Sequence, residues 1–137
     1  MSYFDEELEK EFSTYHTPYK KLEQGTHDDF VIYINNKLPF AGAKIDWNSL
    51  PNSKNFNEHE KSQAFKLITE KIRSLATPEI FFIGDSLTEC AYQVEIKDLE
   101  RALLIFSEIP QHSYFFPKDL SWIGCISAEG HIDLSTI

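Results

Sequence analysis

The stretch that decides the fold is Ile80-Phe81-Phe82-Ile83-Gly84-Asp85-Ser86-Leu87-Thr88-Glu89. Four apolar residues run directly into Gly-Asp-Ser, and a short apolar run that ends in turn residues is typical of a strand buried on both faces. Helical patterns lie before and after this run in the sequence. We therefore expect residues 79–84 to form a buried strand with helices on either side of it in the chain.

Three apolar stripes at helical spacing predict three helices. They are Phe4/Leu8/Phe12/Tyr15, Phe65/Ile68/Ile72/Leu75 and Leu99/Ala102/Leu103/Phe106. Ser2 is a suitable N-cap for the first helix, over residues 3–13, and Asn57 with Glu60 three positions later resembles a capping box for the second. Asp98 can cap the third, while Thr77-Pro78 and Pro110 end the second and third. The outward face of the first helix is rich in Glu and Asp, so we expect that helix to dock loosely.

The remaining segments predict loops and short strands. Residues 16–29 are polar and predict a loop. Phe30–Ile34 predicts a strand, Asn35-Asn36 a turn, and Leu38–Ala41 a return strand that Pro39 confines to an edge. Residues 46–57 predict a long polar loop that Trp47 and Leu50 anchor to the core.

The second half of the chain predicts further strands. Cys90–Ile96 predicts a second strand or an irregular return, and His112–Phe116 a strand that Pro117 ends. Trp122–Ser127 and His131–Ser135 flank Glu129-Gly130, which is the pattern of a β-hairpin with a glycine-containing turn.

These elements predict a single α+β domain over residues 1–137, with about three helices, a mixed or mostly antiparallel sheet and a C-terminal β-hairpin. The 42% apolar and 14% aromatic content of the 137 residues is typical of a packed domain. No apolar run is long enough to span a membrane, and residues 1–11 lack the apolar core of a signal peptide, so we expect a cytoplasmic protein. Cys90 and Cys125 are expected to be reduced and buried, with a disulfide or a metal pair as the alternatives.

The net charge of −9 is concentrated in the second half of the chain. Residues 79–137 contain ten acidic and three basic residues, whereas residues 1–78 contain twelve and ten. Nucleic acid is disfavoured as a partner, because binding phosphates requires Lys and Arg. A cationic partner is favoured, and ordinary solubility is the alternative reading of the same charge.

The segment from Phe82 to Glu89 resembles the first sequence block of the GDSL (SGNH) esterases and lipases, which implies Ser86 as the nucleophile. That family also uses a Gly-x-Asn-Asp block and a C-terminal Asp-x-x-His, and neither follows Ser86 in this chain. Residues Ile109 and Ala128 occupy the positions three before His112 and His131, where the family has Asp. Acyl transfer needs a base and oxyanion donors besides the serine, so we expect Gly84-Asp85-Ser86 to be a turn and the esterase to be the alternative.

Other catalytic arrangements have less support. His131 and Asp133 lie two apart on a predicted strand, and with Cys125 on the paired strand they suggest a thiol site, with a polar surface as the alternative. The sequence has no phosphate-binding glycine loop and no His/Cys cluster at metal-ligand spacing, so we expect no cofactor and no metal.

From Ile80 onward the chain is similar to small bacterial immunity proteins of polymorphic-toxin and contact-dependent growth-inhibition systems. The segments that carry this resemblance are residues 82–86, 109–112, 114–116, 119–122 and 129–133. It implies a non-enzymatic cytoplasmic protein that binds and neutralises one basic toxin domain, often a nuclease. A regulatory or scaffold domain with another protein partner is a further alternative.

The physical reading of this resemblance assigns an acidic face and two aromatic anchors. The candidate partner-binding residues are Asp85, Glu89, Tyr114, Asp119, Trp122, Glu129 and Asp133. For the two aromatic residues, packing in the core is the alternative. We expect a monomer or a weak homodimer.

Overall fold

The structure is a computed structural model, and it describes residues 2–23, 25–42, 44–75 and 78–137. Its main feature is a seven-stranded sheet in which every pair of neighbouring strands is antiparallel. In spatial order the strands are β1 (Lys20–Lys21), β6 (Tyr92–Glu95), β5 (Glu79–Gly84), β7 (Ser113–Phe116), β8 (Trp122–Ile126), β9 (Ile132–Thr136) and β4 (Lys54–Phe56). A separate hairpin pairs β2 (Phe40–Ala41) with β3 (Lys44–Ile45). The predicted α+β class with a mostly antiparallel sheet is confirmed.

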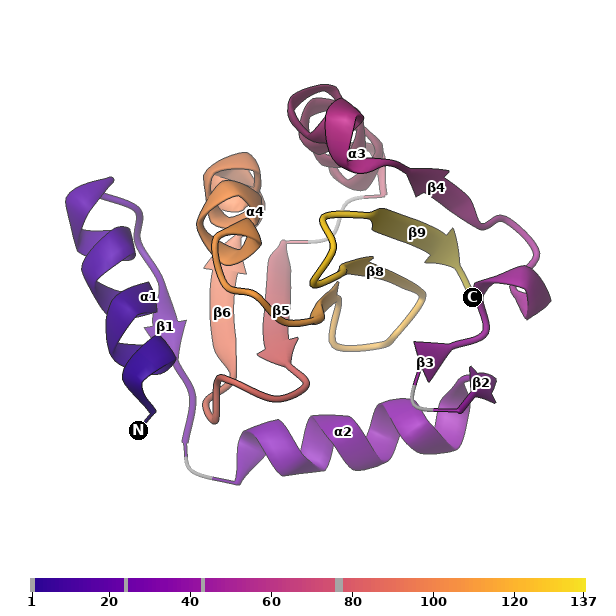
Figure 1. The fold of residues 1–137 in the computed structure, drawn as a ribbon, viewed down its shortest axis with the longest axis horizontal. Coiled ribbons are helices and arrows are strands. Elements are labelled where there is room, and N and C mark those ends of the chain that lie inside the picture. The colour runs from indigo at the N-terminus through magenta and orange to yellow at the C-terminus, as the bar shows by residue number, and fades with distance from the viewer. Residues whose placement is uncertain (1, 24, 43, 76–77) are drawn as a thin grey trace.

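Four α-helices within the described residues cover this sheet. They are α1 (Tyr3–Thr14), α2 (Thr26–Lys37), α3 (Lys61–Ser74) and α4 (Leu99–Ser107), joined by 3₁₀ turns η1 (Trp47–Ser49), η2 (Glu58–Glu60) and η3 (Ile96–Asp98). In Figure 1, α1, α4 and α3 follow one side of the sheet, whereas α2 and the β2–β3 hairpin lie on the other side. The arrangement gives the sheet two covered faces, which we call the first face (α1, α3, α4) and the second face (α2, β2–β3).

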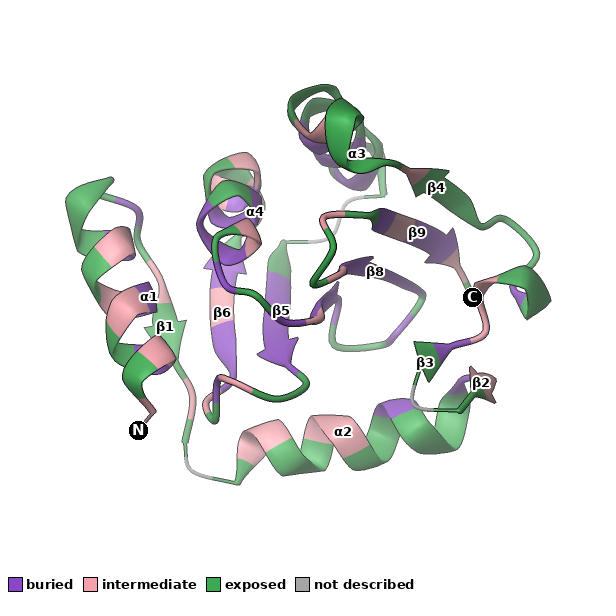
Figure 2. Cartoon of the chain, viewed as in Figure 1, coloured by how far each residue is buried: buried purple, intermediate pink, exposed green. Residues whose placement is uncertain are grey.

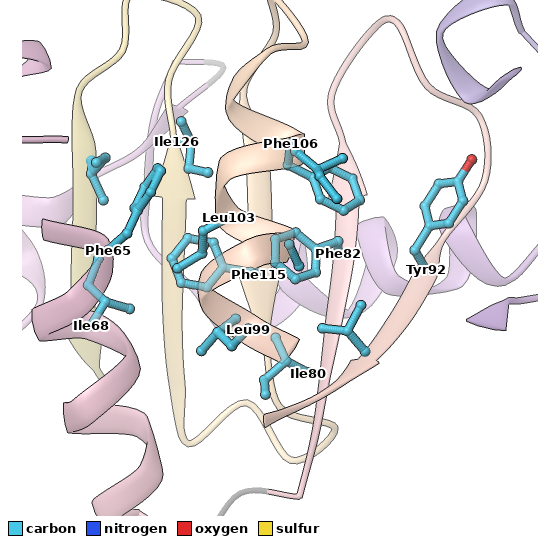
Figure 3. Packing of buried hydrophobic residues seen from close by; sticks show 14 of the residues in the cluster. Phe65, Ile68, Ile80, Phe82, Tyr92, Leu99, Leu103, Phe106, Phe115 and Ile126 are labelled. Carbon is cyan, nitrogen blue, oxygen red and sulfur yellow. The ribbon is translucent and has the colours of Figure 1, made fainter. Parts of the chain in front are cut away.

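The first face holds the larger core. Alternate residues of a strand point to the same face, so Ile80 and Phe82 of β5 and Phe115 of β7 all point toward the helices. Leu103 and Phe106 of α4 and Phe65 and Ile68 of α3 meet them there, as Figure 3 shows. The Phe82 ring stacks on Phe106 with ring centroids 4.2 Å apart. In Figure 2 most of β5 and parts of α4 are coloured as buried.

The second face holds a smaller core. Phe81 and Ile83 of β5 point to it, and Ile34 of α2, Ile45 of β3 and Leu50 pack on the same side. The prediction that the 79–84 strand is buried on both faces is therefore confirmed. Leu50 is buried and Trp47 packs against this core, as expected for the two anchors of the 46–57 segment.

The strand predicted at Phe30–Ile34 is wrong, because this segment lies within α2 and Asn35-Asn36 continue the helix. Helix α2 has Asp28 and Asp29 in its first turn and Lys37 in its last, which suits the helix dipole. Ile34 is buried at helical spacing from Phe30, whereas Ile32 and Tyr33 are 59% and 39% exposed. One side of the apolar run therefore packs on the sheet and the other faces solvent. The predicted return strand is shortened to β2, which pairs with β3.

Other boundaries also differ from the predictions. Residues 16–29 contain β1 and the start of α2, and residues 46–57 contain η1 and the edge strand β4. Helix α3 ends at Ser74, so Leu75 lies beyond it and is 42% exposed. Thr77 lies outside the described residues. Helix α1 docks firmly rather than loosely, because Leu8 and Phe12 are buried in the first-face core.

The capping predictions are confirmed in two of three cases. Ser2 and Asp5 form a capping box at the start of α1, and Asn57 and Glu60 form one at η2, directly before α3. Asp98 occupies the N-cap position of α4 without a side-chain capping hydrogen bond. The C-terminal hairpin forms as β8 and β9, with Ile126 opposite Ile132. None of the helices in the described ranges has the length and apolar character needed to cross a bilayer.

Candidate partner-binding site

The loop that follows β5 is held rigidly from inside the molecule. Gln111, which is buried, accepts hydrogen bonds through Oε1 from the backbone N–H groups of Ser86, Leu87 and Thr88, at 3.4, 2.8 and 3.2 Å. Its Nε2 donates to Thr88 Oγ1 at 2.9 Å. A side chain at Gly84 would collide with both Gln111 and Thr88, so glycine is needed where the strand meets the loop. The loop is therefore a preformed platform.

A buried carboxylate, Asp5, holds the other end of the same loop. The carboxylate accepts hydrogen bonds from the backbone N–H groups of Glu89 and Cys90, at 2.8 and 3.2 Å, and from the Tyr92 hydroxyl at 2.6 Å. The Ser2 hydroxyl adds another bond at 2.7 Å. Burial alone would raise the pKa of Asp5, but these hydrogen bonds outweigh it and lower the pKa. The carboxylate thus joins α1 to the loop.

Three hollows adjoin one another on and beside this platform. The first, of about 630 Å³, lies between the 85–90 loop and the start of α2. The middle hollow, of about 460 Å³, lies between α2 and the end of β5 and shares His27 and Asp85 with the first. The third, of about 330 Å³, lies beside β3 and shares Tyr114 with the middle hollow. We call these three hollows together the acidic groove.

Carboxylates outnumber cationic side chains along the acidic groove. Its carboxylates are Glu23, Asp28, Asp85, Glu89, Glu129 and Asp133. Lys21 and Lys44 are its lysines, and Lys21 pairs with Glu9 of α1 at 3.2 Å. Histidines also line the groove. His112 joins Asp85 to the turn between β8 and β9: Asp85 Oδ1 accepts from the His112 backbone N–H at 3.1 Å, and His112 Nδ1 accepts from Ala128 N at 3.3 Å. The groove therefore presents a net negative surface.

The floor of the third hollow is a polar row that crosses the sheet on the second face. Tyr114 of β7 lies opposite Cys125 of β8, Cys125 lies opposite Asp133 of β9, and Asp133 lies opposite Asn55 of β4. Asn55 Nδ2 donates to Asp133 Oδ1 at 2.8 Å. Burial raises the pKa of Asp133 despite this bond, so the ionised carboxylate is held in an unfavourable environment.

Two more titratable groups of this row are also shifted. Burial, together with the charges of Asp133 and Asp85, raises the pKa of the Cys125 thiol, which is opposite to the shift that a nucleophilic cysteine needs. Burial likewise raises the pKa of Tyr114, and Asp85 and Asp133 contribute to that rise. The negative charges of Asp85 and Asp133 therefore act on both the Cys125 thiol and the Tyr114 hydroxyl, in addition to burial. Both cysteines are free, as predicted, and Cys125 is buried whereas Cys90 is half-buried.

The acidic groove unites five of the seven residues that the sequence singled out. Asp85, Glu89, Tyr114, Glu129 and Asp133 line it. Asp119 does not: it lies in the turn between β7 and β8, where its Oδ1 accepts from Ser121 N at 3.0 Å and Lys37 donates to its backbone oxygen. Trp122 is 1% exposed and packs against Phe115 in the first-face core, so it cannot serve as a surface anchor.

Sequence reasoning missed the contribution of the first half of the chain to this groove. Glu23 and Asp28 were assigned to a loop, and Lys44 was given no role. Asp28 in the first turn of α2 and Glu23 before that helix line the same hollow as Asp85, and Lys44 of β3 lines the same hollow as Glu129. Charge counted along the chain could not find them, because the relevant proximity arises from the fold.

The hydroxyl of Ser86 donates to Asp85 Oδ1 at 3.2 Å, and His27 lines the same hollow. His27 Nε2 contacts the Gly84 carbonyl oxygen at 2.7 Å, and because a carbonyl only accepts, Nε2 is the donor. Cys125, His131 and Asp133, the residues of the suggested thiol site, all line the third hollow. His131 Nε2 lies 3.3 Å from Glu58, and burial raises the pKa of the Cys125 thiol, which disfavours the nucleophilic thiolate. Across the described parts of the chain, no three His, Cys, Asp or Glu side chains are grouped so as to hold a metal ion.

Comparison with known proteins adds no assignment to this geometry: no protein-family model matches the chain, and no curated protein sequence matches it.

Proposed function

We propose that this protein is an immunity protein of the producing cell's cytoplasm, which binds a basic toxin domain through the acidic groove and neutralises it without catalysis. The observation that carries the proposal is the gathering of six carboxylates around three adjoining hollows, with only Lys21 and Lys44 among them. Proteins that bind polyanions present basic surfaces, so a nuclease toxin has the complementary charge. Occupying such a surface would exclude its substrate.

The rigidity of the platform supports binding with little conformational cost. Gln111 and Asp5 hold the 86–90 loop by hydrogen bonds to five backbone N–H groups. A preformed surface loses less entropy on binding than a flexible one. The raised pKa of Asp133 points the same way, because a partner's cation would relieve the unfavourable ionised state.

The two edges of the sheet support a monomer. Edge strand β1 consists of Lys20 and Lys21, and edge strand β4 begins with Lys54. Lysines on edge strands oppose edge-to-edge pairing of sheets. We expect sedimentation at micromolar concentration to give the mass of one chain, with at most a weak dimer.

The direct test is protection of cells. The C-terminal domain encoded by the gene immediately upstream is expressed under an inducible promoter, with and without this protein. We expect the domain to stop growth alone and the protein to restore it. A domain that is harmless, or whose toxicity this protein does not relieve, contradicts the proposal. The alternative of a regulatory domain with another partner predicts no protection.

Charge reversal locates the binding surface within the same assay. Replacing Glu23, Glu89 and Glu129 with Lys changes three exposed positions of the acidic groove. The matched control replaces Glu70, Glu79 and Asp119, which are exposed and lie outside the groove. We expect the groove variant to associate with the toxin domain about tenfold more slowly at low salt and the control to change by less than about twofold. Equal effects would remove the groove from the proposal.

The esterase alternative has one observation in its favour, which is that Ser86 and His27 line the same hollow. The amide groups of residues 86–88 are engaged by Gln111, and His27 Nε2 by Gly84, so activation of the hydroxyl would require both sets of bonds to change. Turnover of p-nitrophenyl acetate that disappears in Ser86→Ala would favour this alternative. Identical background rates for wild type and variant would eliminate it.

A further inference from the structure

We propose that the middle hollow of the acidic groove is a socket for one arginine side chain of the basic partner. The socket deepens the proposed function and rests on it, since it names the group by which the partner is held. The hollow lies between α2 and the end of β5, midway along the groove, and it has a volume of about 460 Å³. That space is sufficient for one long side chain.

The walls of the socket suit an aliphatic stem. Val31 and Ile34 of α2, Phe40 of β2 and Ile83 of β5 line it. Ile34 and Ile83 are buried, and Val31 and Phe40 are partly buried against the same core. An extended chain of methylene groups can bury its surface against such walls while its head reaches a polar group.

The polar groups of the socket include oxygen atoms that form no hydrogen bond with any described residue. Tyr114 is only 8% exposed, yet its hydroxyl forms no hydrogen bond with any residue that the structure describes. The Asp85 carboxylate accepts from the His112 N–H and the Ser86 hydroxyl through Oδ1, and no described residue donates to its Oδ2. Asn35 adds an amide oxygen to the lining. A guanidinium that donates to these oxygens would form charge-assisted hydrogen bonds, which are about twice as strong as neutral ones.

Arginine suits these acceptors better than lysine does. The acceptors come from both walls of the hollow, with Asp85 after β5 and Tyr114 of β7 on the sheet and Asn35 on α2. A guanidinium has five N–H donors in one plane and stacks on aromatic rings such as those of Phe40 and Tyr114. An ammonium is a compact, strongly hydrated charge, which gives up its hydration with difficulty.

The test uses small probes, so it does not need the toxin. The ¹⁵N-labelled full chain is titrated with N-acetyl-arginine N-methylamide, and the amide shifts of Ile34, Ile83 and Tyr114 are followed. The lysine and norleucine analogues are titrated in parallel. The variants are Asp85→Asn and Tyr114→Phe, and Asp119→Asn is the matched control, because Asp119 carries the same charge outside the groove. Asn at position 85 keeps the oxygen that His112 and Ser86 need, and the unliganded spectrum of each variant checks its fold.

We expect saturable shifts with the arginine analogue and about tenfold weaker affinity for the norleucine analogue, because the latter lacks the charged head. Asp85→Asn should weaken arginine binding by about tenfold and Tyr114→Phe by about threefold, whereas Asp119→Asn should leave it unchanged. Absence of saturable shifts, equal binding of norleucine, or equal weakening by Asp119→Asn would overturn the socket. Equal binding of lysine would overturn the assignment to arginine. If the protein protects cells but does not bind the arginine analogue in this way, only the socket is contradicted. If it binds the analogue as expected but does not protect cells, only the immunity function is contradicted.

Discussion

The two faces of one sheet are covered to different extents. On the first face, α1, α3 and α4 cover the strands with an apolar core that contains Phe82, Phe106 and Phe115. On the second face, α2 and a small hairpin form a smaller core, and the polar row from Tyr114 to Asn55 runs from that core to the edge strand β4. The same strands thus supply the core with one set of residues and the acidic groove with the alternate set.

The carboxylates of Asp5 and Asp133 show the same difference between the two faces. Asp5, on the side of the first face, is fully buried, and its many donors lower its pKa. Asp133, on the second face, accepts a hydrogen bond from Asn55, and burial raises its pKa. The first carboxylate stabilises the fold, whereas the second is held at a cost on the surface to which we assign the function.

The largest expected effect tests whether the first face carries the stability. Phe82→Ala removes a fully buried ring that stacks on Phe106 at 4.2 Å and lies 5.6 Å from Phe115. We expect the free energy of unfolding to fall by about 4 kcal/mol in urea titrations. Tyr114→Phe, on the second face, should change it by less than about 0.5 kcal/mol, because the hydroxyl has no partner among the described residues. Comparable losses for both variants would contradict the division between the faces.

The second-largest expected effect concerns the Asp5 carboxylate. Asp5→Asn removes the charge that accepts hydrogen bonds from the Glu89 and Cys90 amides and from Tyr92, and we expect a loss of about 3 kcal/mol at pH 7. The folded-state pKa of Asp5 lies below the ordinary aspartate value of 3.8, so its stabilisation is present above that value. It disappears as the pH falls through the lower, folded-state pKa. The difference between wild type and variant should therefore shrink in acid.

Glu6→Gln is the control for this pH dependence, because Glu6 is exposed in the same first turn of α1. Its effect on the free energy of unfolding should stay within about 0.5 kcal/mol at every pH. A constant difference between wild type and Asp5→Asn from pH 7 down to pH 2 would show that Asp5 does not titrate in this way.

Most of the fold could be predicted because the patterns of β5, α3, α4 and the β8–β9 hairpin are local. Phe65, Ile68 and Ile72 lie on one side of a helix wherever that helix packs. Residues 30–34 were misassigned because five consecutive apolar residues satisfy both a strand and a helix. The distinction depends on contacts that the run itself does not contain, since Phe30 packs on Phe81 and Phe116 and leaves Ile32 exposed.

The candidate site could be predicted only in part. The acidic residues of the second half were visible as composition, and Asp85, Glu129 and Asp133 do meet on one side of the molecule. Which of them meet depends on strand register and on α2, so Glu23 was missed and Asp119 lies outside the groove. Trp122 was misassigned because an aromatic residue on a strand suits either face until its register is known, and here it points to the first face.

The smallest expected effect is an increase in stability when Asp133 is replaced. It tests whether Asp133, on the second face, serves binding instead of stability. The ionised Asp133 is disfavoured in the folded state, so the free energy of unfolding falls as the pH rises from the ordinary aspartate value of 3.8 through the raised, folded-state pKa. Asp133→Asn keeps an oxygen for the Asn55 bond and removes the charge. At neutral pH we expect the variant to be more stable than wild type by about 0.5 kcal/mol or less, and this advantage should vanish in acid. Protection against the toxin domain should weaken at the same time. A variant that loses stability at pH 7 would place Asp133 with Asp5 among the residues that stabilise the fold. A variant that gains stability with protection unchanged would show that Asp133 has no part in binding the toxin domain.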